Sequence, residues 1–147
     1  MQAKFALAAA ATVLSASIAY GQDLTGDAAA GESVFRQCAA CHNAVNAEGD
    51  VLAGRPNMRT GPNLYGIAGR AVGSIEDFRY SPGLTAVNEM GVEWDEEAFA
   101  AYIVDPTGWI RETTGESGLR GAMAAQRMRG DTDAVDLYAY LASLSAE

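Results

Sequence analysis

The sequence predicts an all-α fold of several short helices joined by long loops. Two stretches, residues 95–104 and 132–144, carry apolar side chains at the three- and four-residue spacing of one helix face. No stretch alternates apolar and polar side chains convincingly enough to predict a strand, and the chain has no internal repeat. Between residues 43 and 73 glycine recurs six times and proline twice, a pattern typical of loops.

Residues 1–21 have the pattern of a cleaved signal peptide. Lys4 gives the segment a positive start, an apolar run follows, and small residues end it. The apolar run has near half of the roughly 20 residues that span a bilayer, so we expect export rather than a retained anchor. Cleavage is expected before Gln22, with a cut after Ala19 as the alternative. Residues 22–147 then form one domain.

The exported domain is strongly acidic. Lys4 is the only lysine, so loss of the leader leaves nine arginines against nineteen acidic residues, a net charge of about −10. This charge argues against nucleic acid or an anionic membrane as a partner. No other stretch is apolar enough to be transmembrane, so we expect no stable membrane insertion. We also expect a monomer.

The first helix is expected over residues 28–37. Asp27 precedes it as a helix cap, and Val34 and Phe35 are its expected packing residues. Gly31 lies inside this helix at a cost of roughly 1 kcal/mol relative to alanine. Either the helix is weak there, or a neighbour packs too closely for a side chain.

Two further helices follow the glycine-rich stretch. Ser81 and Pro82 read as the cap and first residue of a short helix that Gly91 closes. A firmer helix covers residues 95–104, because acidic side chains at its start suit the helix dipole. One face of this helix carries Phe99, Tyr102 and Ile103.

Asp105 and Pro106 end that helix and start a short one through Ile110. Residues 113–121 are expected to form a loop. The last helix covers residues 132–144. Its apolar stripe comprises Ala134, Leu137, Tyr138, Leu141 and Leu144.

The chemistry of the chain is concentrated in Cys38-Ala-Ala-Cys41-His42, which uses every cysteine and the only histidine. Two thiols at this spacing can form thioether bonds to a heme, and the following histidine can bind its iron. A redox disulfide would sit in a βαβ unit, and a zinc site needs four ligands; neither context is present. The motif therefore predicts one covalently bound heme c, with the helices and loops wrapped around it.

No further histidine and no lysine beyond the leader can bind the iron, which leaves a methionine thioether, the N-terminal amine as a remote option, or an open site. The candidate methionines are Met58, Met90, Met123 and Met128. Methionine is usually core filling. Spacing favours Met123, which follows a glycine-rich loop and precedes the last helix, and leaves Met128 as a competitor.

Several motifs follow one another in order along residues 22–147. After Cys38–His42 come Thr60-Gly-Pro-Asn-Leu-Tyr-Gly66, Gly69-Arg70, Trp94-Asp-Glu-Glu97 and Asp136-Leu-Tyr-Ala-Tyr-Leu141. Together they resemble the class I cytochromes c, and most nearly the bacterial cytochrome c2 type. The resemblance implies the class I cytochrome c fold over essentially the whole exported chain.

The resemblance also implies roles for particular residues. Met123 matches the methionine that binds the iron before the last helix. The Pro62 carbonyl is implied to accept the Nδ1 proton of His42, which fixes the tautomer of that ring. Gly31 and Tyr140 match a contact between the first and last helices, which would explain the glycine.

For the heme carboxylates the resemblance implies three partners, Arg70, Tyr80 and Trp94, with Tyr102 lining the methionine side. Buried carboxylates need charges or hydrogen-bond donors, and these side chains supply them. Plain core packing is the alternative for Trp94 and Tyr102.

A heme with histidine and methionine ligands has no vacant position, which predicts a periplasmic one-electron carrier rather than an enzyme. The resemblance implies transfer from a cytochrome bc complex to a terminal oxidase or photosynthetic reaction centre. The alternatives are a dedicated electron acceptor of a periplasmic dehydrogenase and a heme peroxidase, which would need a distal acid–base residue. The family usually docks through lysines, so arginines are expected to replace them here.

Overall fold

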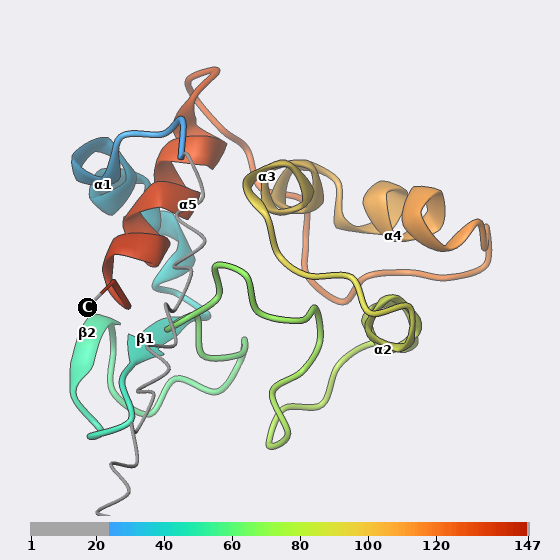
Figure 1. Ribbon diagram of the computed structural model, residues 1–147, viewed down its shortest axis with the longest axis horizontal. Coiled ribbons are helices and arrows are strands. Elements are labelled where there is room, and N and C mark those ends of the chain that lie inside the picture. Colours follow the sequence, from blue (N-terminus) through green and yellow to red (C-terminus); the bar gives the residue numbers. More distant parts are fainter. Residues whose placement is uncertain (1–23, 147) are drawn as a thin grey trace, which may run out of the picture.

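The computed structural model describes residues 24–146. It contains five helices and one two-stranded sheet (Figure 1). In chain order the elements are α1 (Ala28–Cys38), β1 (Asn43–Val45), β2 (Val51–Gly54), α2 (Pro82–Glu89), α3 (Glu96–Val104), α4 (Pro106–Thr114) and α5 (Asp133–Ser143). The predicted leader, residues 1–21, lies outside the described residues. Within residues 24–146 no helix combines the length and apolarity needed to cross a membrane.

The helix starts follow from local capping. The Asp27 carboxylate accepts from Ala29 N at 2.8 Å, and the Asp95 carboxylate accepts from Ala98 N at 2.7 Å. Ser81 Oγ accepts from Leu84 N at 3.3 Å. These side chains satisfy amide groups that the first helical turn leaves unpaired. The predicted starts of α1 and α2 are confirmed, and α3 starts one residue later than predicted, with Asp95 as its cap.

Two short strands correct the prediction that residues 43–73 hold no strand. β1 and β2 pair antiparallel, with Ala44 opposite Ala53 and an irregularity after Ala44. The β2 side chains Val51 and Leu52 are 40% and 41% exposed, so this strand has no buried face to produce alternation. Its sequence therefore lacks the alternation of apolar and polar residues by which a strand is predicted.

Helix α4 is one turn longer than predicted. It continues past Ile110 to Thr114 and ends at Gly115, whose φ of 73° lies in the left-handed region. Glycine adopts that conformation without a steric penalty, so it terminates the helix. The fully buried side chain of Ile110 fastens α4 to the rest of the molecule.

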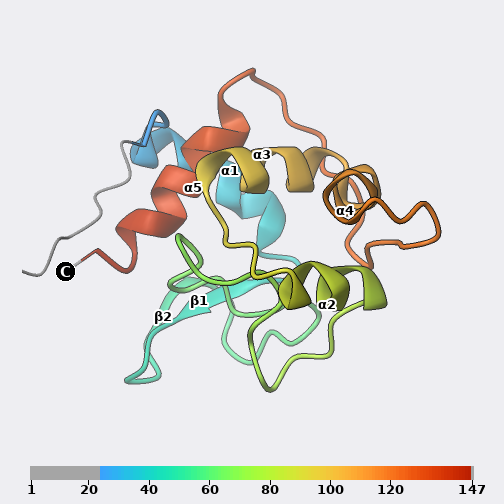
Figure 2. The same ribbon diagram turned by 45° about the vertical axis from the view of Figure 1, so that its right-hand side comes forward.

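The first and last helices pack directly against each other (Figures 1 and 2). A Cβ at Gly31 would overlap the Asp136 carbonyl oxygen and lie 2.8 Å from Tyr140 Cβ, so only glycine permits this approach. Phe35 packs on Tyr140 with ring centroids 5.8 Å apart. The awkward glycine of α1 is thus explained by the contact with α5.

The core lies between α5, α3 and the loop that follows the hairpin. Leu137, Tyr138 and Leu141 of α5 are at most 1% exposed, and Leu144 is half-buried at the end of the stripe. The Tyr138 hydroxyl donates to the Trp94 carbonyl at 2.7 Å, which ties α5 to the segment before α3. This core stops at a large apolar cavity.

Candidate heme site

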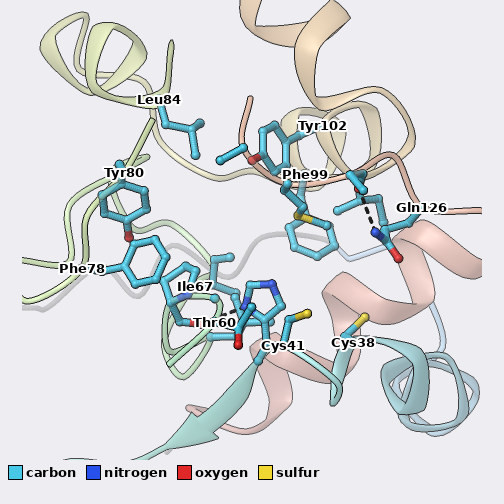
Figure 3. Close-up of a pocket in the computed structure, with 18 of the residues that line it drawn as sticks. Cys38, Cys41, Thr60, Ile67, Phe78, Tyr80, Leu84, Phe99, Tyr102 and Gln126 are labelled. Atoms are coloured by element: carbon cyan, nitrogen blue, oxygen red, sulfur yellow. Dashed lines mark hydrogen bonds between the residues drawn. The ribbon is translucent and has the colours of Figure 1, made fainter. Parts of the chain in front are cut away.

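A cavity of about 370 Å³ opens at the end of α1, beside Cys38 and Cys41 (Figure 3). Its volume falls in the range of cofactor pockets. Its apolar wall comprises Leu64, Ile67, Leu84, Phe99, Ile103 and Leu137. In Figure 3 the two thiols lie on one side of the cavity, with Phe99 and Tyr102 on another.

The turn after α1 brings the cysteines and His42 together. Cys38 is the last residue of α1, and its carbonyl accepts from Cys41 N at 3.0 Å and His42 N at 2.9 Å. These two bonds fold the chain back on itself, so all three side chains line the same cavity.

The His42 ring is held in one orientation. Its Nδ1 lies 2.9 Å from the Pro62 carbonyl oxygen, which can only accept, so Nδ1 carries the proton. Burial lowers the pKa of His42 below its ordinary value, the Pro62 bond opposing this in part, so the ring is neutral at neutral pH. Among the described residues Nε2 has no partner. Its lone pair is available to a metal.

Gly61 lets the neighbouring loop lie flat against that ring. A Cβ at Gly61 would come within 2.7 Å of His42 Nε2 and nearer still to other ring atoms. Gly61 N donates to the Cys41 carbonyl at 2.7 Å, which fixes the loop there. Sequence reasoning identified Pro62 but missed this contact; the glycine before Pro62 was its only signal.

The environment of Cys38 is not that of a reactive redox thiol. Burial, and secondarily the neighbouring Cys41, raises the pKa of Cys38 to about 11. Reactive disulfide-exchange cysteines have lowered pKa values, so the environment of Cys38 is that of an unreactive thiol. Within residues 24–146 no three histidine, cysteine or acidic side chains gather where they could hold a metal ion. The zinc alternative therefore has no ligand set there.

The structure separates the four candidate methionines. Met123 and Met128 line the cavity, whereas Met90 is 56% exposed and Met58 lines a different cleft. The Met128 sulfur accepts from Gln37 Nε2 at 3.8 Å. The Met123 sulfur has no hydrogen-bond partner among the described residues. Met123 therefore has the thioether that remains available.

Tyr80, expected at the heme carboxylates, and Tyr102, expected on the methionine side, both line the cavity. Burial raises the pKa of Tyr80 above its ordinary value and that of Tyr102 to about 12, so both hydroxyls stay protonated and can donate. Both groups fit polar roles in a largely apolar cavity.

Arg70 and Trp94 lie outside the residues that line the cavity. Arg70 donates to the Tyr65 carbonyl at 2.7 Å and the Asn63 carbonyl at 3.0 Å. The Trp94 ring stacks on Trp109 with centroids 5.4 Å apart. Arg70 thus holds the backbone on both sides of the cavity-lining Leu64, and the Trp94 ring lies 5.1 Å from the ring of the cavity-lining Tyr102, so both residues support the cavity wall.

Arg79 is a cavity-lining cation that sequence reasoning missed. It lies next to Tyr80 in the chain and borders both the main cavity and the cleft beyond Thr60. Its position before Tyr80 was the only signal available. A guanidinium there suits a ligand that carries carboxylates.

The donor set fits a heme. Two thiols, a neutral imidazole with a free Nε2 and an unengaged thioether line one apolar cavity. These are the attachment and iron-binding groups of c-type cytochromes. Phenol and guanidinium groups supply the polar edge that heme carboxylates need.

Comparison with known proteins agrees with this donor set. Residues 28–145 match the family model for cytochrome c. The chain belongs to the cytochrome c family. As a member of this family it carries one covalently bound heme c.

Within the family its similarity is to the bacterial cytochromes c2. It is 52% identical over 122 residues to cytochrome c2 of Rhodovulum adriaticum, covering 83% of this chain and 95% of that one. The X-ray structure of cytochrome c2 from Rhodobacter sphaeroides aligns with a TM-score of 0.78 at 40% identity, covering 83% and 98%. Ferric cytochrome c-550 from Paracoccus versutus aligns at 0.74 with 36% identity, covering 82% and 99%. The predicted class I fold is confirmed, and the chain is an electron carrier of the c2 type.

Proposed function

We propose that this chain is a periplasmic one-electron carrier whose heme iron is bound by His42 and Met123. The observation that carries the proposal is the His42 ring, neutral and oriented by Pro62 with Nε2 free in the cavity. Bound heme c supplies the one-electron couple. His42 and Met123 would both hold the iron, which would leave no position for oxygen or a substrate, and no catalytic residue is proposed.

Met123 is preferred over Met128 as the second ligand. Its thioether has no hydrogen-bond partner among the described residues, whereas that of Met128 is engaged by Gln37. A carrier benefits from a ligand kept through both oxidation states, and a soft thioether stabilises ferrous iron and raises the potential.

The remaining site residues hold and orient the heme. Cys38 and Cys41 would form the two thioether bonds. Tyr80 would donate to a carboxylate, and Tyr102 would line the methionine side. Arg70 would stabilise the heme carboxylates through the electric field of its half-buried positive charge.

Trp94 is proposed to act at the heme edge through its indole N–H. Among the described residues that group has no hydrogen-bond partner, so it is available to a carboxylate.

The location and domain organisation follow from the leader. Residues 1–21 would be removed on export, leaving residues 22–147 as one monomeric domain in the periplasm. The acidic charge makes nucleic acid an unsuitable partner. We expect electrons to pass from a cytochrome bc complex to a terminal oxidase or a photosynthetic reaction centre.

Docking is proposed to use arginines around the cavity mouth. Six of them are exposed and lie near cavity-lining residues or the hairpin in the chain: Arg36, Arg55, Arg59, Arg120, Arg127 and Arg129. Arg127 and Arg129 flank Met128, and Arg59 precedes Thr60, both of which line the cavity. A local positive rim would attract an acidic partner despite the net negative charge.

Salt dependence tests the arginine rim. Attraction is screened over about 10 Å at 0.1 M salt, so the rate of reduction by the bc complex should fall as salt rises. Arg120→Gln with Arg127→Gln should lower the low-salt rate, while Glu89→Gln on α2 should not. A rate that rises with salt, or ignores the double substitution, would contradict docking through arginines.

Absorption spectra of the purified protein test the proposed function itself. The reduced and oxidised forms should show a six-coordinate c-type heme, and acidified acetone should leave the heme on the protein through Cys38 and Cys41. Heme extracted into the solvent would contradict thioether attachment, and a five-coordinate spectrum would favour a peroxidase.

A further inference from the structure

The segment that carries Met123 has no secondary structure of its own. It is the methionine loop, residues 115–132, between α4 and α5. In Figures 1 and 2 it runs back between α2 and α4 before it rises to α5. A ligand on an unsupported loop is poorly positioned, so contacts with rigid elements must fix the sulfur in place.

Two side chains of α4 bind the backbone of this loop just before Met123. Arg111 Nε donates to the Leu119 carbonyl at 3.0 Å. The Thr107 hydroxyl accepts from Gly121 N at 3.2 Å. Thr107 and Arg111 are four residues apart, so they share one face of α4 and bind the loop side by side.

Helix α2 approaches the same segment at Arg120, and the start of α4 approaches it at Gly121. A Cβ at Gly83 would lie 2.6 Å from the Arg120 carbonyl oxygen. A Cβ at Gly121 would lie 3.1 Å from Pro106 Cβ at the start of α4. We call residues 119–121, held between α2 and α4 in this way, the 119–121 clamp.

A second attachment follows Met123. Gln126 N donates to the Ile103 carbonyl near the end of α3, at 2.8 Å. Met123 thus lies in a short span between two fixed points, two residues after Gly121 and three before Gln126.

The α4 attachment rests on a rigid base. The Asp105 carboxylate caps α4 by accepting from Gly108 N at 2.9 Å. Ile110, which lies between Thr107 and Arg111 in sequence, is fully buried. The 119–121 clamp can therefore move only if its hydrogen bonds to Thr107 and Arg111 break, because α4 itself is held in place.

We propose that Thr107 and Arg111 are positioning residues that set how readily Met123 leaves the heme iron. The inference rests on Met123 being the ligand, as proposed above. An added ligand such as imidazole binds only when the methionine is displaced, so its apparent affinity scales with the displaced population. Each clamp bond opposes that displacement.

Imidazole titration of the ferric heme-loaded protein tests this. Thr107→Val keeps the shape and removes the acceptor, leaving Gly121 N unpaired. This variant should bind imidazole about five-fold more tightly, because the net loss of one hydrogen bond, about 1 kcal/mol, corresponds to about that factor in the binding constant. Arg111→Gln should also raise the imidazole affinity. Thr107→Ser keeps the hydroxyl acceptor and should therefore have the imidazole affinity of the wild type.

The matched control is Thr113→Val. Thr113 lies on the same helix, and its side chain makes no hydrogen bond among the described residues. It should leave imidazole affinity unchanged. Hydrogen exchange of loop amides around Gly121 should rise in Thr107→Val and stay unchanged in Thr113→Val.

Two results overturn the inference in distinguishable ways. If Thr107→Val lowers the global stability but leaves the imidazole affinity unchanged, the bond between Thr107 and Gly121 is a structural contact only and does not control Met123. If Met123→Ala, measured in parallel, keeps the sulfur-to-iron charge-transfer band, the ligand assignment fails and the clamp proposal fails with it.

Discussion

Replacing Gly61 by alanine tests the packing that orients His42. The added methyl group would lie 2.7 Å from His42 Nε2, and closer to two other ring atoms, where ordinary contacts begin near 3.4 Å. The imidazole or the loop must therefore move by about an ångström. Such overpacking costs about 1–3 kcal/mol. Loss of the bond between Nδ1 and Pro62 adds about 1 kcal/mol.

We therefore expect Gly61→Ala to lower the free energy of unfolding by about 2–4 kcal/mol. Guanidinium unfolding of the heme-loaded protein, followed by heme absorbance and far-ultraviolet circular dichroism, measures it. Gly118→Ala is the control, because a Cβ there meets nothing within 4 Å. A Gly61→Ala value within about 0.5 kcal/mol of wild type, the range of harmless substitutions, would refute the packing.

Three further perturbations address the helix contact, a helix start and the cavity edge. Gly31→Ala should destabilise by about 1–2 kcal/mol, because overlap with the Asp136 carbonyl exceeds the gain in helix propensity; a stabilised variant in thermal melts would contradict this. Hydrogen bonds from the Gly130 and Arg129 amides lower the pKa of Asp133, so its carboxylate stabilises the fold at pH values above its ordinary pKa of 3.8. The difference in stability between the wild type and Asp133→Asn should shrink as the pH falls below 3.8. A difference that does not depend on pH would contradict this. Tyr80→Phe should lower the potential in a redox titration, by at most the roughly 40 mV that corresponds to one full hydrogen bond, because a donor at a heme carboxylate reduces its negative field at the iron. An unchanged potential would argue against a carboxylate contact.

The parts of the fold that sequence predicted are those decided by neighbouring residues. Asp27, Ser81 and Asp95 cap their helices through bonds to residues two or three positions away. The cysteine–histidine motif is equally local, because a single turn places its side chains together. Such features need no knowledge of the rest of the chain.

What the sequence missed depends on contacts between distant residues. The hairpin was not predicted because exposed Val51 and Leu52 leave no periodic pattern. Spacing favoured Met123 but left Met128 open, since the difference lies in a contact with Gln37, 91 residues away. The packing of Gly61 on His42 likewise appears only once the loop has folded back.

The central claim is that His42 and Met123 bind the heme iron and leave no open position. The most direct test compares Met123→Ala with Met128→Ala in the ferric protein. Met123→Ala should abolish the weak red sulfur-to-iron charge-transfer band and lower the potential, because the thioether is lost, while Met128→Ala should keep the band. If Met128→Ala abolishes the band and Met123→Ala retains it, the ligand assignment is contradicted.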